Sequence, residues 1–211
     1  MRAEPDGLER HAVHTTVAAL YVDPNGVYAN LPGVEVWDET RDARLYAGPW
    51  PVVAHPPCGR WCALAPMMES MHGYKVGDDG GCFRAALKAV RFYGGVLEHP
   101  AHSFAWRRFN LPYPTRGLWV RSLLDEGWVA EVDQAAYGHP ARKRTWLYLV
   151  GNPIELDWGS PAVAAQVSSF AHGRVVAETE RVRPRQASAT PVAFRDALLA
   201  LASDLTITPP K

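Results

Sequence analysis

Short apolar runs separated by polar, turn-rich connections dominate the first half of the chain. Residues 15–22 (TTVAALYV) are rich in β-branched and apolar side chains, and residues 23–26 (DPNG) then form a strong turn signal. Residues 33–37 (GVEVW) and 51–54 (PVVA) are two further runs of this kind. Such runs predict three strands of a parallel or mixed sheet with short crossovers.

A helical period follows these runs. Residues 82–93 (CFRAALKAVRFY) place apolar side chains three and four positions apart, which predicts an amphipathic helix that ends at Gly94-Gly95. Residues 96–98 (VLE) then predict a short strand that Pro100 ends, because proline cannot continue a β-ladder.

The second half predicts shorter elements around one polar, basic loop. We expect short helices at 103–109 and 118–125, strands at 128–132 and 145–150 on either side of the loop 134–144, and a last amphipathic helix that ends near Ser203. That helix has Thr190 as its predicted N-cap and Pro191 at its first position.

This order of elements predicts one α/β domain with accessory segments. The domain covers residues 15–150 and follows a loose leader at 1–14. Residues 151–189 show little periodicity and are expected to form an irregular connection or a small substrate-contacting region. Residues 190–211 are expected to pack a C-terminal helix on the core.

Composition adds limits on location and partners. The 211 residues are 47% hydrophobic and 21% charged, which is ordinary for a globular protein. A net charge of +0 does not indicate a polyanion partner for the molecule as a whole. No apolar run approaches the roughly 20 residues of a membrane span, and the first ten residues are charged, so we expect a cytoplasmic protein without a membrane partner.

Three loops carry the residues that are candidates for catalysis. Cys58 follows the apolar run 51–54 and a double proline, so it is expected at the carboxyl end of a strand, where α/β proteins bind ligands. Glu98 occupies the same kind of position on the next predicted strand. The basic residues 142–144 (RKR) precede a third strand. The loops therefore offer a nucleophile, an acid and an anion clamp.

These motifs, in this order, resemble the DNA cytosine-5 methyltransferases, particularly the short phage-type proteins. In that family a Pro-Cys at a strand end supplies the thiolate that attacks cytosine C6, and Pro57-Cys58 matches it. A glutamate turn contacts N3 and the exocyclic amine of the base, and Glu98-His99-Pro100 matches its first and last positions. An arginine loop before a hydrophobic strand positions the base, and Arg144 is the best counterpart.

The resemblance implies a Rossmann-like, methyltransferase-type sheet, mostly parallel, with helices on both faces. It implies S-adenosylmethionine as cofactor and cytosine in DNA, or a pyrimidine nucleotide, as substrate. Cys58, Glu98 and Arg144 would be catalytic. Substrate contacts would come from Pro57, His99, Arg142 and Lys143, and cofactor contacts from Asp23, Gly26, Asp38 and Asp42.

Two alternatives remain open at this stage. The three cysteines form an odd set without a secretory signal, which favours free thiols or a metal site over disulfides. A zinc-dependent base-modifying enzyme would use His55, Cys58, Cys62 and Cys82 as ligands. A methylase-like module that only binds nucleic acid or protein is favoured by the single glycine after the first strand and by the short region between Val150 and Thr190.

Overall fold

A computed structural model describes residues 16–159 and 183–204; the predicted leader and most of the irregular connection lie outside these residues. The strands are β1 (Val17–Leu20), β2 (Val34–Trp37), β3 (Val52–Ala54), β4 (Gly95–Pro100), β5 (Val120–Arg121), β6 (Trp128–Asp133) and β7 (Arg144–Val150). The α-helices are α1 (Ala65–His72), α2 (Cys82–Tyr93), α3 (Phe104–Arg108), α4 (Pro184–Ser188) and α5 (Val192–Ser203), with short 3₁₀ helices η1 (Ala43–Leu45) and η2 (Gln134–Tyr137).

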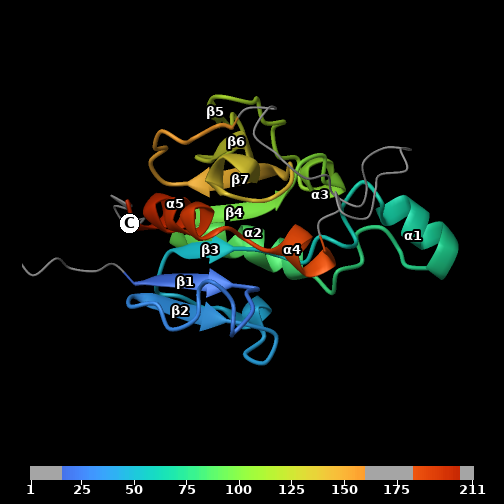
Figure 1. The fold of residues 1–211 in the computed structure, drawn as a ribbon, viewed down its shortest axis with the longest axis horizontal. Coiled ribbons are helices and arrows are strands. Elements are labelled where there is room, and N and C mark those ends of the chain that lie inside the picture. Colours follow the sequence, from blue (N-terminus) through green and yellow to red (C-terminus); the bar gives the residue numbers. More distant parts are fainter. Residues whose placement is uncertain (1–15, 160–182, 205–211) are drawn as a thin grey trace, which may run out of the picture.

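The described strands form one mixed sheet in the order β2-β1-β3-β4-β7-β6-β5 (Figure 1). Strands β2, β1, β3 and β4 run parallel. Strand β7 then pairs antiparallel with β4, and β6 and β5 continue antiparallel. The predicted α/β class is confirmed, but the parallel arrangement is confined to one end of the sheet. The first residues of β7 consequently lie at the same edge as the last residues of β4.

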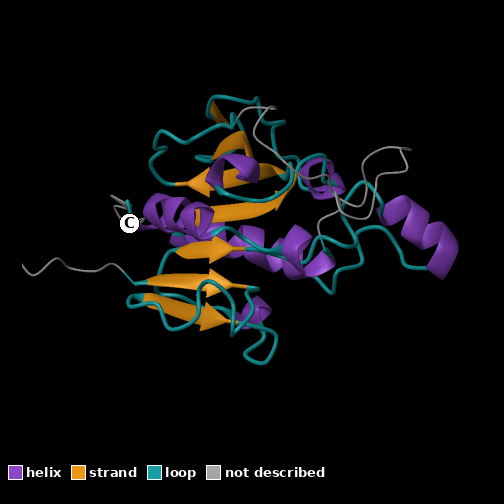
Figure 2. Ribbon diagram, viewed as in Figure 1, coloured by secondary structure: helices purple, strands orange, loops and turns teal. Residues whose placement is uncertain are grey.

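Helices cover both faces of the sheet (Figure 2). On one face α2 packs Phe83, Ala86 and Val90 against a core that includes Leu20 and Leu97. On the other face α5 packs Phe194, Leu198 and Leu201 against a core that includes Ala19 and Val96. Because neighbouring residues of a strand point to opposite faces, β1, β3 and the first half of β4 need apolar residues at every position. This is why they appear in the sequence as unbroken apolar runs.

The carboxyl side of the parallel strands gathers the irregular segments. In Figure 1 the arrows of β1, β2 and β3 point toward the side on which α1, α3 and α4 lie. The first two residues of the turn that leads to α1, Pro57 and Cys58, are exposed on this side. In the described part of the chain, no helix has the length and apolar character needed to cross a membrane.

Two predicted elements need correction, and one helix forms where none is predicted. Residues 118–125 do not form a helix: they contain β5 and a turn in which Ser122 Oγ and Asp125 Oδ1 accept backbone N–H groups. Such local bonds compete with helical ones, and Leu123 and Leu124 are exposed rather than packed. Helix α5 begins one residue later than expected, with Pro191 as its N-cap. Helix α1 forms where no periodicity predicts one, and it leaves Met67 and Met71 exposed.

Candidate active site

The turn after β3 presents Cys58 to solvent. His55 N–H donates to Leu20 O at 3.0 Å and so extends the pairing of β3 with β1 by one residue. Two prolines then end the ladder. The carbonyl of Cys58 accepts hydrogen bonds from the N–H groups of Trp61 and Cys62, both at 2.9 Å, which closes the turn and leaves the side chain of Cys58 exposed.

Glu98 lies beside this turn on the neighbouring parallel strand. Ala54 of β3 is in register with Leu97 of β4, so the next residue of each strand, His55 and Glu98, also meet. His55 Nδ1 lies 3.0 Å from Glu98 Oε2, and Gln134 Nε2 donates to Glu98 Oε1 at 3.1 Å. Glu98 is 8% exposed. Burial alone would raise the pKa of Glu98, but the His55 hydrogen bond and the Lys143 charge lower it to about 2.

Hydrogen bonds continue outward from both oxygens of Glu98. Tyr28 Oη lies 2.9 Å from His55 Nε2, and Gln134 Nε2 also donates to Thr145 Oγ1 at 2.9 Å. Burial raises the pKa of Tyr28, so its hydroxyl keeps its proton. The carboxylate therefore sits in a fixed chain of polar groups that reaches from the residues after β1 to the start of β7.

Lys143 supplies the positive charge of the site. Its Nζ donates to the carbonyls of Ser188 and Ala189, at 3.2 and 2.9 Å, where α4 ends. Burial lowers the pKa of Lys143, and the charges of Glu98 and Cys58 raise it in return. Lys143 is thus held by backbone dipoles while its charge acts on the acid and the thiol together.

The Cys58 thiol is not activated in this arrangement. Partial desolvation, Glu98 and Cys62 raise the pKa of Cys58 to about 11, and Lys143 lowers it only in part. A thiol with this pKa is almost fully protonated at neutral pH. Formation of the thiolate therefore requires a change at the site, such as neutralisation of Glu98 or the arrival of a cationic or proton-accepting group.

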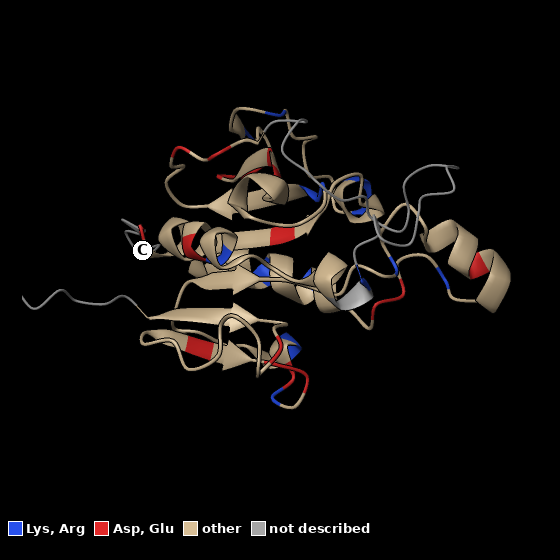
Figure 3. Cartoon of the chain, in the orientation of Figure 1, with Lys and Arg blue, Asp and Glu red and all other residues tan. Residues whose placement is uncertain are grey.

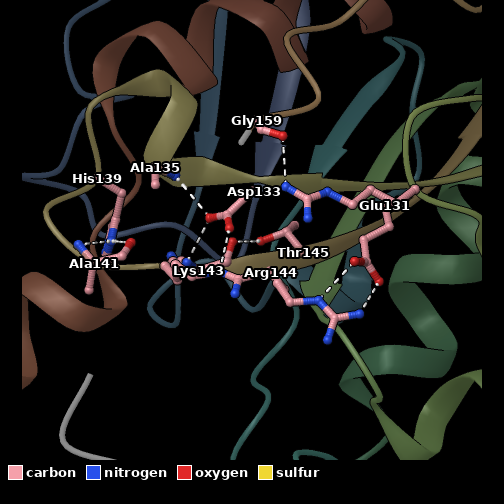
Figure 4. Close-up of polar contacts among 11 residues, drawn as sticks. Glu131, Asp133, Ala135, His139, Ala141, Lys143, Arg144, Thr145 and Gly159 are labelled. Atoms are coloured by element: carbon pink, nitrogen blue, oxygen red, sulfur yellow. Dashed lines mark hydrogen bonds and ion pairs between the residues drawn. The ribbon is translucent and has the colours of Figure 1, made fainter. Parts of the chain in front are cut away.

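Arg144, the residue predicted to be catalytic, pairs with a carboxylate of the sheet. Its Nε and one Nη donate to the two oxygens of Glu131 at 2.8 and 2.9 Å, as Figure 4 shows, and Trp146 Nε1 donates to Glu131 at 2.8 Å. Strand neighbours point to opposite faces, so Lys143 and Arg144 diverge. Lys143 acts on Cys58 and Glu98, whereas Arg144 is neutralised by Glu131.

The other predicted substrate contacts are spread over the edge. Arg142 is bound to buried Asp133 at 3.2 Å, and Asp133 also accepts the N–H of Lys143 (Figure 4). His99 lies in the core on the α2 face, with its ring 5.1 Å from Phe83 and 6.4 Å from Trp106. Burial lowers the pKa of His99 to about 4, so it is neutral at pH 7. The structure brings the charge of Lys143 to Cys58 and Glu98, whereas His99 packs among the aromatic side chains of the α2 face, beside the backbone of Pro56 and Pro57.

The predicted cofactor residues follow β1 and β2, and their carboxylates are engaged locally. Asp23 Oδ1 accepts the N–H of Asn25, and Asp38 Oδ1 accepts the N–H of Arg41. Both oxygens of Asp42 bind the guanidinium of Arg44. A Cβ at Gly26 would lie 3.1 Å from Asp23 Cβ and Asp23 O, so the turn itself explains this glycine.

The four alternative metal ligands do not assemble. His55 is bound by Tyr28 and Glu98, while Cys82 begins α2 and has its carbonyl bonded by Tyr21. Across residues 16–159 and 183–204, no three His, Cys, Asp or Glu side chains are grouped so that they could hold a metal ion.

Four residues of the site have no predicted role in acid-base chemistry: Tyr28, His55, Gln134 and Thr145. The sequence holds one signal for His55: it is the last residue before the double proline and therefore lies at the end of a predicted strand. Glu98 lies near a strand end for a similar reason, since Pro100 follows it by two positions. Gln134 and Thr145 join the site through the antiparallel pairing of β6, β7 and β4, which no local pattern predicts.

A comparison with models of known protein families gives no match, and neither does a comparison with curated protein sequences.

Proposed function

We propose that this chain modifies the C5 position of a pyrimidine, with Cys58 as the nucleophile. The observation that carries the proposal is the convergence of Cys58, Glu98 and Lys143 at the edge of the sheet where β3 and β4 end and β7 begins, since the charges of Glu98 and Lys143 both act on the Cys58 thiol. A thiol, a buried carboxylate and an ammonium group are the functions that addition to a cytosine ring requires.

In the proposed reaction the Cys58 thiol gives its proton to a solvent base, and the resulting thiolate forms a bond to C6 of cytosine. The electron pair of the C5–C6 double bond moves toward C5 and the ring. Glu98 is ionised because its pKa is about 2, and it accepts a hydrogen bond from the exocyclic amine of the cytosine. Its negative charge also favours protonation of N3, and the protonated ring draws electrons away from C6. A carboxylate oxygen has two lone pairs, so the bonds from His55 and Gln134 leave capacity for the base.

The intermediate then takes an electrophile at C5, loses the original C5 proton and expels Cys58 as thiolate. When no other electrophile is present, a solvent proton serves, and the product is cytosine whose C5 hydrogen has exchanged with water. The protons lost from Cys58 and from C5 pass to solvent, so the exchange needs water and the residues of this chain and no other co-reactant.

S-adenosylmethionine is the donor that the resemblance implies, but the residues that follow β1 and β2 do not fit it in this arrangement. Asp23 and Asp38 each accept a backbone N–H of their own loops, Asp42 binds Arg44, and a Cβ at Gly26 would lie 3.1 Å from Asp23. The proposed reaction therefore uses no group of this cofactor.

A binding module without catalysis is the second candidate. The raised pKa of Cys58, about 11, favours it, because a protonated thiol is a poor nucleophile. In this case the chain would hold nucleic acid or protein at the same edge of the sheet without forming a bond to C6.

Hydrogen exchange at C5 separates the two candidates. Wild-type protein is incubated in D₂O with a cytosine-containing oligonucleotide or with dCTP, with and without S-adenosylmethionine, and the nucleosides are analysed by mass spectrometry. We expect deuterium at C5 with wild type and Cys62→Ser, and none with Cys58→Ala. Equal exchange by wild type and Cys58→Ala would refute the thiolate mechanism, and absence of exchange and transfer in every arm would favour the binding module.

A further inference from the structure

Exposed basic side chains without an acidic partner gather on α2 and α3. Arg84 and Lys88 lie one turn apart on α2, and Arg107 and Arg108 end α3; all four are exposed. No ion pair joins any of them to a carboxylate of the described residues. By contrast, salt bridges engage the arginines at positions 41, 44, 91, 121, 142, 144 and 195.

The distribution of charge explains how a neutral chain presents such a patch. Figure 3 shows basic segments on α2 and α3, whereas β2 and the loop that follows it carry acidic segments. A net charge of +0 for the whole chain therefore does not prevent these four basic side chains from lying together without an acidic partner among the described residues. The α2–α3 surface can attract a polyanion although the whole molecule does not.

Two hollows lie along this basic surface. The first, of about 600 Å³, is lined by Trp61, Glu69, Phe104, Arg107 and Arg108 among others. The second, of about 460 Å³, is lined by Arg84, Leu87, Lys88, Arg91, Phe92 and Phe109. Each hollow thus combines aromatic rings with cations, and only the first contains a carboxylate.

Phe109 links the two hollows. Its ring centroid lies 5.9 Å from that of Trp61, which lines the first hollow. The guanidinium groups of Arg84 and Arg108 each lie 5.9 Å from the same ring, one from each hollow. Phe92, 71% exposed, also lines the second hollow. Both hollows therefore place cations close to aromatic rings.

The turn that carries the candidate nucleophile also contributes to the first hollow. Trp61, in the wall of that hollow, donates its backbone N–H to the carbonyl of Cys58 at 2.9 Å. The first hollow is therefore lined by a residue of the same turn as Cys58.

We propose that the two hollows form a track for single-stranded DNA, which delivers an unpaired cytosine to Cys58. Arg84, Lys88, Arg107 and Arg108 bind successive phosphates, and bases stack on Phe92 and Phe104. Proteins that bind single strands combine a basic groove with such aromatic platforms. A duplex keeps its base faces stacked inside and cannot use them. The inference rests on the proposed function only for the identity of the delivered base.

Binding of a fluorescein-labelled oligo(dT) of twelve nucleotides, followed by anisotropy at several salt concentrations, tests the track. Four phosphate contacts predict a slope of log Kobs against log salt of about −3, and Arg107→Gln/Arg108→Gln or Arg84→Gln/Lys88→Gln should reduce it to about −1.5. Phe92→Ala, at an exposed site, should weaken binding about fivefold or more. The control Arg41→Gln/Arg121→Gln removes two exposed, paired arginines elsewhere and should bind like wild type.

The competitors decide the class of ligand. An abasic oligomer of the same length, the corresponding duplex and polyglutamate should each compete at least about fivefold more weakly than oligo(dT). Equal competition by polyglutamate would identify an acidic protein as the ligand and overturn the proposal, as would equal loss of binding in the Arg41/Arg121 control. Circular dichroism of each variant confirms that the fold is retained.

Failure of the track and failure of the proposed chemistry give different results. Cys58→Ala should bind oligo(dT) like wild type, and this binding supports the track even if no exchange at C5 occurs. Exchange on dCTP by a wild-type protein that does not bind oligo(dT) would overturn the track and leave the chemistry of Cys58 intact.

Discussion

His55 Nδ1 and Glu98 Oε2 lie 3.0 Å apart and join the residue after β3 to the neighbouring strand β4. The side chains of His55 and Glu98 are only 13% and 10% exposed, so water screens their interaction little. Together with the charge of Lys143, this hydrogen bond keeps the Glu98 carboxylate ionised inside the protein.

Loss of the His55 side chain should change the titration of Glu98. In His55→Ala we expect the pKa of Glu98 to rise from about 2 toward 4 or above, because burial is then opposed by fewer donors. The free energy of unfolding should fall by about 1–3 kcal/mol. Carboxyl ¹³C NMR measures the pKa, and Tyr28→Phe, which leaves the His55–Glu98 bond in place, serves as the control. A pKa of Glu98 unchanged in His55→Ala would contradict this reading of the site.

The two cations at the start of β7 should have different effects. In Lys143→Met the pKa of Cys58 should rise further above 11, since the charge that lowers it is gone, and iodoacetamide should alkylate Cys58 severalfold more slowly near pH ~9. In Arg144→Gln the alkylation rate should stay within about twofold, because Arg144 is paired with Glu131. Peptide mapping by mass spectrometry separates Cys58 from the other two thiols.

Arg144→Gln should instead reduce stability. Glu131 is 5% exposed and would keep only the Trp146 donor, so we expect a loss of about 2 kcal/mol in the free energy of unfolding. Urea denaturation measures it. Arg121→Gln, whose partner Glu126 is exposed, should cost less than about 0.5 kcal/mol. Equal losses in the two variants would show that Glu131 tolerates the missing charge.

His99 predicts a loss of stability in mild acid. Its pKa is about 4 in the folded chain and 6.5 in the unfolded chain, so below pH 6.5 the unfolded state takes up a proton that the folded state refuses. Between pH 7 and pH 4.5 this costs about 2 kcal/mol. His99→Phe should lose that part of the pH dependence in urea denaturation. An unchanged pH dependence in the variant would mean that His99 is protonated in the folded chain.

Gly95 tests the close approach of β3 and β4. A Cβ at this position would lie 2.0 Å from Val52 O, and its φ is +108°, so Gly95→Ala should destabilise the fold by about 3 kcal/mol or more. Gly59→Ala, where a Cβ would meet no atom within 4 Å, should change the free energy of unfolding by less than about 1 kcal/mol. Thermal unfolding followed by circular dichroism compares the two variants.

The local sequence pattern predicts an element correctly where the apolar residues of that element alone show its period or its burial. Helix α2 lies at the residues that its apolar spacing predicts, and the unbroken apolar runs of β1 and β3 mark strands that are buried on both faces. Helix α1 escaped prediction because it leaves long apolar residues exposed and has no periodic buried face.

The partners within the site depend on pairing between distant strands. Cys58 and Glu98 could be placed at strand ends from the sequence, because Pro-Pro and Pro100 mark those ends. Which of Lys143 and Arg144 serves the thiol depends on the register of β7 against β4 and β6, which local sequence does not determine. The pairing of His55 with Glu98 depends in the same way on the parallel register of β3 and β4.

Because Lys143 and Arg144 point in opposite directions, the length of the segment between β6 and β7 determines which cation faces the Cys58 thiol. A one-residue insertion or deletion there that shifts β7 against β4 by one position would place an arginine, Arg142 or Arg144 according to the direction of the shift, in the position of Lys143. Guanidinium remains charged under all ordinary conditions, whereas burial can discharge an ammonium group. The present register therefore gives the site a cation that can give up its proton, and a change in loop length would convert it into one that cannot.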